Sequence, residues 1–319
     1  MSDTVFIVLS IFGLIGIGYL AARSRLLSAE TGDALADFVF TIAIPLLLFR
    51  TLARADFHGV DPWRLWLAYF AGVLVTWTVA HMLVRRVFGR DARSGVVAGV
   101  SAGFGNTVLI GIPLVRATYG EPGMVAVLIL VSVHLPVMMA ASLLLNTWAR
   151  SRDGLAPEGT SRAGMVRGFL LELIRHPIVL GILAGGLWHF LSLPIPALMG
   201  ELVDSLADIA GPLALFACGM GLARYGIARN VPAASVLAAM KLVVMPAVVL
   251  VVSELVGLSP LSTAAMVLVA ASPTGVNAFL IANRFGTGEA LASNATLISS
   301  AGGVATVSFW LFVVRLITG

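Results

Sequence analysis

The stretch SAGFGNTVLIGIP, residues 101–113, places three glycines, an asparagine, a threonine and a proline inside an otherwise apolar run. Glycine and proline weaken a helix, and a broken helix leaves backbone N–H and C=O groups without partners. Within a membrane, such backbone is tolerated only where it is buried in protein or lines a cavity. The stretch therefore predicts a membrane-spanning helix that is interrupted at a binding site.

The composition indicates that most of the chain lies in a membrane. Hydrophobic residues make up 59% of the 319 residues, charged residues make up 11%, and the mean hydropathy is +1.00. Apolar runs of about 20 residues, each long enough to cross a bilayer, recur along the chain. These values predict an all-α polytopic membrane protein, and the first run, residues 4–22, is expected to be a retained helix. The basic residues lie in loops, a pattern typical of membrane topology and not of nucleic-acid binding.

Ten transmembrane helices are predicted by dividing the chain at its charged and Pro/Gly-rich points. The predicted spans are residues 4–22, 34–52, 63–88, 94–116, 122–148, 167–191, 198–222, 233–256, 260–283 and 290–316.

The arginines set the predicted orientation. Thirteen arginines lie in the loops that follow the odd-numbered spans, and five lie on the opposite side. Because positive residues favour cytoplasmic loops, the odd loops are predicted to be cytoplasmic and both termini outside. The polar segment 151–166 is the expected cytoplasmic linker between two halves, residues 1–150 and 167–319.

The two halves carry related sequences. IAIPLLLF (Ile42 to Phe49) returns as IAGPLALF (Ile209 to Phe216), with six of eight positions identical at an offset of 167 residues. Five spans in each half place the second copy upside down relative to the first, which is the inverted-repeat plan of many secondary transporters. The sequence therefore predicts a 5+5 inverted repeat.

A second interrupted run stands where this repeat requires one. ASPTGVNAFLIANRFG (Ala271 to Gly286) combines proline, glycine, threonine and asparagine, and it aligns Asn277 with Asn106 at an offset of 171 residues. Two half-helices whose N-termini meet near the midplane would present N–H groups to an anion. The predicted substrate-binding residues are Gly105, Asn106, Thr107, Ser272, Pro273, Thr274, Gly275, Val276 and Asn277. The alternative is that these small residues only pack helices closely.

At these residues the sequence resembles the auxin efflux carrier family, which includes plant PIN proteins and bacterial malonate and malate carriers. GNTVLIGIPLVRATYGE (Gly105 to Glu121) is similar to the PIN fourth-helix pattern, and PTGVNAFL (Pro273 to Leu280) is similar to the bacterial carboxylate carriers. Gly105 and Asn277 stand where PIN proteins have proline and valine, so an auxin-shaped pocket is not implied.

The resemblance implies a fold, a mechanism and a location. It implies two crossed discontinuous helices, spans 4 and 9, in a mobile transport domain of spans 3–5 and 8–10. Spans 1, 2, 6 and 7 would form a scaffold that pairs as a homodimer, and substrate would cross by an elevator-like movement. The prolines Pro45 and Pro212 would then produce structural kinks in the scaffold. The expected location is the plasma membrane, which in a bacterium is the inner membrane.

Ionisable residues inside spans are costly and are candidates for function. Lys241, the single lysine, would balance a carboxylate substrate or pair with an acidic residue, or else reach the membrane surface. His134 would line the cavity, relay protons or be a structural histidine. Asp37, Asp204 and Asp208 lie near span ends, which favours an interfacial position over proton transfer.

Other classes of protein fit the pattern less well. GVSAG (Gly99 to Gly103) matches the GxSxG nucleophile pattern, but that pattern needs a strand-to-helix elbow, and here it falls in a helical span. The single cysteine and the scattered histidines indicate neither a disulfide nor a metal site, and no cofactor is predicted. The sequence predicts a secondary transporter for a small organic anion, malonate or malate first. An auxin-like monocarboxylate carrier is the alternative, followed by an anion channel.

Overall fold

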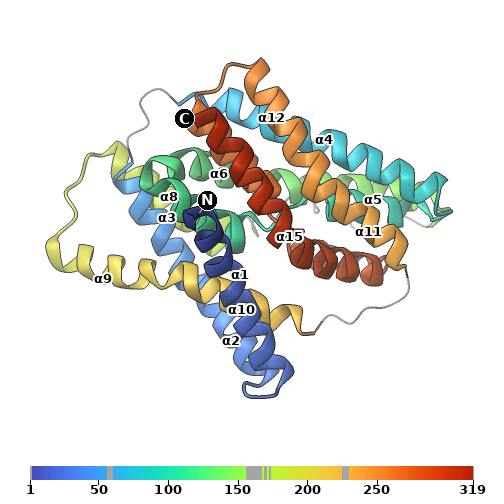
Figure 1. Ribbon diagram of the computed structural model, residues 1–319, viewed down its shortest axis with the longest axis horizontal. Coiled ribbons are helices and arrows are strands. Elements are labelled where there is room, and N and C mark those ends of the chain that lie inside the picture. Colours follow the sequence, from blue (N-terminus) through green and yellow to red (C-terminus); the bar gives the residue numbers. More distant parts are fainter. Residues whose placement is uncertain are drawn as a thin grey trace.

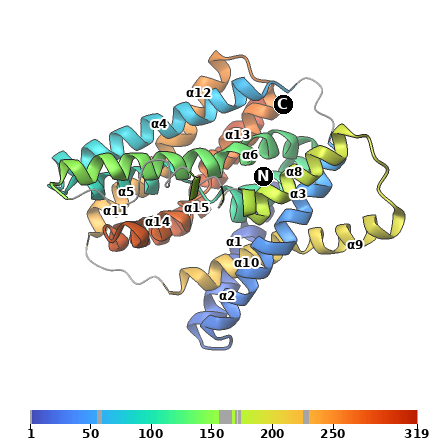
Figure 2. The same cartoon turned by 180° about the vertical axis from the view of Figure 1, so that it is seen from behind.

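The computed structural model describes residues 2–55, 60–155, 167–168, 171, 174–224 and 230–318. Within these residues the chain is built from helices (Figures 1 and 2). Seven helical segments of the described part are long and apolar enough to cross a membrane, and α8 (Pro177–Phe190) and α13 (Pro260–Ala271) are shorter apolar helices. These helices confirm a multi-pass membrane protein. The predicted linker 151–166 lies outside the described residues from 156 onward.

The remaining elements follow in chain order. The first half contains α1 (Ser2–Arg23), α2 (Ala29–Phe38), η1 (Val39–Ala43), α3 (Ile44–Ala53), α4 (Pro62–Arg86), α5 (Ala92–Gly103), η2 (Thr107–Gly111) and α6 (Ile112–Arg152). The second half contains, besides α8 and α13, α9 (Ala197–Asp208), α10 (Ala210–Leu222), α11 (Val231–Ala239), η3 (Met240–Val244), α12 (Met245–Leu255), α14 (Asn277–Phe285) and α15 (Glu289–Thr318).

The helices form two groups that draw members from both halves of the chain. In one group α1 packs along α10 and α3 packs along α8, with α9 beside α3 (Figure 1). In the other group α4 packs against α5 and α12, α11 against α15, and α13 against α6 (Figure 2). Helices α1 and α6 also contact each other, so the two groups share an interface.

Three π-helical segments share one cause, a proline shortly after them. Segments η1, η2 and η3 are each followed by a helix whose second residue is Pro45, Pro113 or Pro246. Proline lacks an N–H, and its ring excludes the carbonyl four residues earlier, so a wider turn fits there. Ahead of Pro246, the carbonyl of Leu242 accepts a hydrogen bond of 2.8 Å from Nε1 of Trp310. The helix is thus widened at these prolines without leaving that carbonyl unpaired.

Two further boundaries are set by local backbone. Ahead of Pro212, α9 ends at Asp208 and α10 begins at Ala210. The predicted boundary between spans 4 and 5 falls inside α6, where Gly120 has φ 62° and ψ −153°. This conformation is available essentially to glycine alone, so Gly120 redirects the chain within what is otherwise a continuous helix.

Candidate functional site

The two interrupted helices meet through their backbones. Helix α5 ends at Gly103 and α13 ends at Ala271, and between each and its continuation the chain is extended around Gly105 and Thr274, which form an antiparallel bridge. The N–H of Asn106 donates to the carbonyl of Pro273 at 2.7 Å, and the N–H of Gly275 donates to the carbonyl of Phe104 at 2.9 Å. Each interruption therefore supplies hydrogen-bond partners for backbone groups of the other. Such partners are required inside a membrane, where no water is present to replace them.

The hydroxyl groups of Ser272 and Thr274, two predicted substrate-binding residues, make hydrogen bonds near this bridge. Thr274 Oγ1 donates to the carbonyl of Ser101 at 2.8 Å, and the N–H of Thr274 donates to Ser299 Oγ at 3.0 Å. Ser272 Oγ donates to the carbonyl of Val269 at 2.7 Å. These bonds lie within the protein, so the hydroxyl groups of Ser272 and Thr274 help to hold the interruption in place.

A cavity of about 240 Å³ lies beside the bridge, and we call it the bridge cavity. Six of the nine predicted substrate-binding residues line it, namely Gly105, Asn106, Thr107, Gly275, Val276 and Asn277. Ser272, Pro273 and Thr274 do not. The other lining residues are Phe40, Phe104, Val108, Val131, His134, Leu135, His176, Ile178 and Leu280. The cavity thus lies between the bridge on one side and η1, α8 and α6 on the other.

Two helices begin at the bridge cavity. Segment η2, which continues into α6, starts at Thr107, and α14 starts at Asn277. Among the hydrogen bonds of the described residues, none uses the backbone N–H of Thr107, Val108, Val276 or Asn277. The first N–H groups of a helix have no partner inside it and carry a partial positive charge. The bridge cavity therefore has two sets of N–H donors suited to an anion.

The two predicted asparagines differ in what their side chains contact. Asn106 is 7% exposed; its Oδ1 caps η2 by accepting from the N–H of Leu109 at 3.3 Å, and its Nδ2 donates to Cys218 Sγ at 3.5 Å. Asn277 is partly buried, and its amide makes no hydrogen bond to another residue of the described chain. Asn106 is thus committed to structure, whereas the amide of Asn277 is available to a ligand.

His134 both lines the bridge cavity and belongs to an aromatic cluster. It is 3% exposed, and its Nε2 lies 3.4 Å from the hydroxyl of Tyr69. Its ring centroid lies 5.0 Å from that of Phe104 and 5.2 Å from that of Tyr69. Of the three roles that the sequence leaves open for His134, its position is compatible with both lining the cavity and packing as a structural histidine.

Lys241 lies behind the bridge and not in the bridge cavity. It is fully buried at 0% exposure, so it does not reach the membrane surface. Its Nζ donates to the carbonyl of Ala270 at the end of α13, where the helix carries partial negative charge. A Cβ placed on Gly105 would lie 2.9 Å from this Nζ. Within the described residues Lys241 forms no salt bridge.

The three aspartates near the span ends lie elsewhere. Asp208 accepts from Arg50 at 2.9 Å and from Arg116 at 3.0 Å, and Asp204 accepts from Arg54 at 3.0 Å. These residues line a separate cavity of about 870 Å³ at one end of the helices. Asp37 is exposed and accepts from Thr41 at 3.2 Å. None of these three aspartates lines the bridge cavity.

Two further sequence features bear on catalysis and metal binding, namely the GxSxG pattern and the histidines. Ser101 lies inside α5 and donates to the carbonyl of Val97 at 2.9 Å, so it is not on an elbow. Among the described residues, no group of three His, Cys, Asp or Glu side chains could hold a metal ion.

Tyr69, Cys218 and Ser299 contribute to the site without having been predicted. Each contacts a predicted residue from a distant part of the chain: Cys218 meets Asn106 across 112 residues, and Tyr69 meets His134 across 65. Single tyrosine, cysteine and serine residues in apolar helices carry no motif, so the sequence had no local signal for them.

The chain matches known proteins over nearly its whole length. The model of the family described as membrane transport protein matches residues 4–311. A Rhizobium meliloti protein named "Putative malonate transporter" is 27% identical over 323 residues, spanning 99% of this chain and 97% of its own. The Escherichia coli "Uncharacterized transporter YfdV" is 24% identical over 306 residues, 95% of each chain. The mouse "Lysosomal cholesterol signaling protein" is 26% identical over 219 residues, 66% of this chain but 25% of the mouse protein. This chain belongs to the membrane transport protein family, the auxin efflux carrier family that its sequence resembles.

Proposed function

We propose that this membrane transporter carries a small organic anion, a dicarboxylate such as malonate or malate first, and binds it in the bridge cavity. The observation that carries the proposal is the pair of helix N-termini at that cavity, where four lining residues have backbone N–H groups that make no hydrogen bond within the described chain. Helix N-termini bind carboxylates and phosphates through such groups. The volume of about 240 Å³ is below the range of drug-sized pockets, which favours a small substrate.

The charges around the bridge cavity favour the same class of substrate. Its described lining contains no aspartate or glutamate, and Lys241 lies just behind Gly105. A buried cation without a carboxylate partner is costly, and an anion in the cavity would offset part of that cost. The name of the Rhizobium meliloti relative supports malonate in particular.

Glycine contacts support the inverted repeat. A Cβ on Gly18 of α1 would lie 2.1 Å from the carbonyl oxygen of Phe216 in α10, and one on Gly185 of α8 would lie 2.7 Å from that of Phe49 in α3. Gly185 follows Gly18 by 167 residues (185 − 18), and Phe216 follows Phe49 by 167 (216 − 49). This is the offset of the IAIPLLLF repeat, so the same helix contact between the two halves occurs twice, with the roles of the halves exchanged.

We infer an elevator-like mechanism from the grouping of the helices. The scaffold would comprise α1 to α3 and α8 to α10, and the transport domain, with the two interrupted helices crossing at the bridge, would comprise α4 to α6 and α11 to α15. Polar contacts join the two groups, including Asn106 with Cys218 at 3.5 Å and Arg116 with Asp208 at 3.0 Å. Such contacts can break and re-form as the domains slide. The homodimer would form through the scaffold, with both termini outside the plasma membrane.

Replacing Asn277 with alanine tests the substrate site. Because its amide is free to bind the substrate, we expect the KM for labelled malonate uptake into proteoliposomes to rise roughly tenfold, the loss of about one hydrogen bond to a charged group. The melting temperature should stay unchanged. Asn106→Ala should lower both uptake and melting temperature, because it also removes the cap of η2.

Asn283→Ala is the matched control, since Asn283 is exposed on the same helix α14 and does not line the cavity. Unchanged uptake in both Asn106→Ala and Asn277→Ala would show that the site is wrongly assigned. Thermal stabilisation by malonate, malate and an aromatic monocarboxylate, with and without sodium and at two pH values, would identify the substrate class and coupling ion. Absence of malonate countertransport would instead favour the channel alternative.

A further inference from the structure

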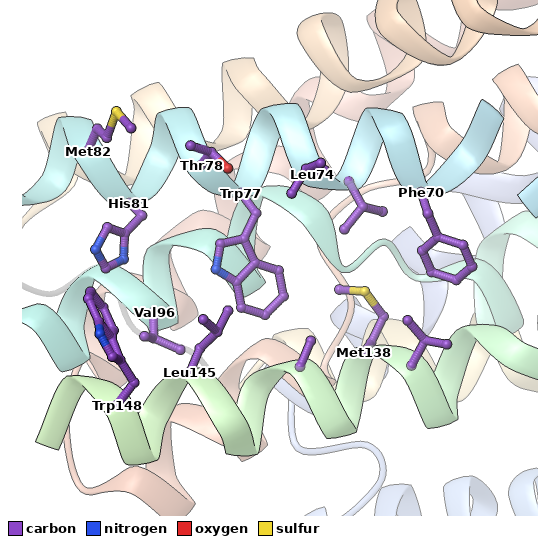
Figure 3. Close-up of a pocket in the computed structure, with 13 residues that line it drawn as sticks. Phe70, Leu74, Trp77, Thr78, His81, Met82, Val96, Met138, Leu145 and Trp148 are labelled. Carbon is purple, nitrogen blue, oxygen red and sulfur yellow. The ribbon is translucent and has the colours of Figure 1, made fainter. Parts of the chain in front are cut away.

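A third cavity runs along α4, α5 and α6, and Figure 3 shows the side chains that line it. We call it the α4–α6 groove; it has a volume of about 510 Å³. Its lining residues are Phe70, Val73, Leu74, Trp77, Thr78, His81 and Met82 of α4, Val96 of α5, and Val137, Met138, Ala141, Leu145 and Trp148 of α6. All but Thr78 and His81 are apolar or tryptophan, so the groove suits a hydrocarbon ligand.

The length of the groove matches one leaflet of a bilayer. On α4 it extends from Phe70 to Met82, and on α6 a similar stretch extends from Val137 to Trp148. Eleven or twelve residues of α-helix rise about 16 to 18 Å. The hydrocarbon core of a bilayer is about 30 Å thick, so one leaflet supplies roughly 15 Å of acyl chain.

One end of the groove is cationic. His81 and Trp148 meet there with ring centroids 5.9 Å apart, and the guanidinium of Arg152 lies 5.6 Å from the Trp148 ring centroid. Arg85 follows His81 by one helical turn on α4. Both arginines are exposed, and within the described residues neither forms a salt bridge. Two free guanidinium groups beside an aromatic pair are suited to the phosphate of a lipid headgroup.

We propose that the α4–α6 groove is a binding site for an anionic phospholipid, with one acyl chain along the groove and the headgroup phosphate between Arg85 and Arg152. Arg85 lies at the end of the third predicted span and Arg152 just after the fifth, on the side whose arginine excess predicts it to be cytoplasmic, where anionic lipids concentrate. The far end of the groove reaches Phe70, whose ring lies 6.4 Å from that of His134 in the bridge cavity. A bound acyl chain therefore packs against the wall of the candidate substrate site.

The test measures lipid binding directly and so does not depend on the proposed substrate. Delipidated, detergent-purified protein is titrated with phosphatidylglycerol or phosphatidylcholine of identical acyl chains and followed by thermal shift and native mass spectrometry. Phosphatidylglycerol should bind at least tenfold more tightly than phosphatidylcholine. The double variant Arg85→Gln/Arg152→Gln should remove that preference, because each arginine near an anionic lipid surface contributes about fivefold in affinity.

Two pairs of variants provide the controls. Ala141→Trp fills the groove and should abolish the tight binding of phosphatidylglycerol. Leu144→Trp, at an exposed position of α6 outside the groove, should leave that binding unchanged. Arg23→Gln/Arg25→Gln removes the same charge from the same predicted membrane side at the end of α1 and should keep the preference. Equal binding of the two lipids to the unmodified protein overturns the proposal. Retention of the lipid by Ala141→Trp overturns it as well.

Discussion

Replacing Lys241 with methionine should nearly abolish malonate uptake while leaving the protein at least as stable. Lys241 is fully buried behind the bridge and forms no salt bridge within the described residues. Two opposite unit charges about 8 Å apart attract each other by about 2 kcal/mol at an effective dielectric constant of 20. We therefore expect KM to rise roughly thirtyfold for a dicarboxylate. Methionine has a similar length and carries no charge, so it removes the desolvation cost of the buried ammonium group.

Two readouts separate this electrostatic role from a structural one. Lys241 also donates to the carbonyl of Ala270, and loss of that bond alone would lower the melting temperature and affect mono- and dicarboxylates alike. The electrostatic role predicts a larger rise in KM for a dicarboxylate than for a monocarboxylate of the same length. Arg315→Met, a change at the far end of α15, controls for the loss of a positive charge. Unchanged uptake in Lys241→Met would remove Lys241 from the mechanism.

The positions at which helices are interrupted could be predicted from the sequence better than the contacts of the side chains at those interruptions. Glycine, asparagine and proline at 101–113 and 271–277 are local signals, and the structure ends α5 at Gly103 and α13 at Ala271. Pro45 was expected to kink its helix, and a π-helical turn precedes it. These features depend on backbone chemistry within a few residues, which the sequence carries directly.

The roles of individual side chains depended on partners far along the chain. Ser272 and Thr274 carry hydroxyls that suit a ligand, yet they bond to Val269, Ser101 and Ser299. Asn106 and Asn277 occupy equivalent places in the alignment, but only Asn106 contacts Cys218 of α10. Lys241 is expected from its position in a span to balance a carboxylate, to pair with an acidic residue or to reach the membrane surface, and the fold buries it behind the bridge. Helix packing decides such contacts, and no spacing within one span encodes them.

Replacing Gly18 or Gly185 with leucine should produce the largest losses of stability. A Cβ at Gly18 would lie 2.1 Å from the carbonyl oxygen of Phe216, and one at Gly185 would lie 2.7 Å from that of Phe49. Both neighbours are backbone atoms that cannot rotate away, so α1 must move from α10 and α8 from α3. Overpacking of this kind costs about 3 kcal/mol, which corresponds to a fall of roughly 6 to 12 °C in the melting temperature.

Glycines on the same two helices supply the controls, because a Cβ at Gly16 or at Gly186 would meet nothing within 4 Å. Leucine at Gly16 or Gly186 should be neutral or slightly stabilising, since glycine is a poor helix former. If the two halves share one architecture, Gly18→Leu and Gly185→Leu must both destabilise, with the larger loss at Gly18, where the contact is closer. If only one of these two variants is destabilised, the two helix contacts are not equivalent. That result would also contradict the packing argument for two inverted halves.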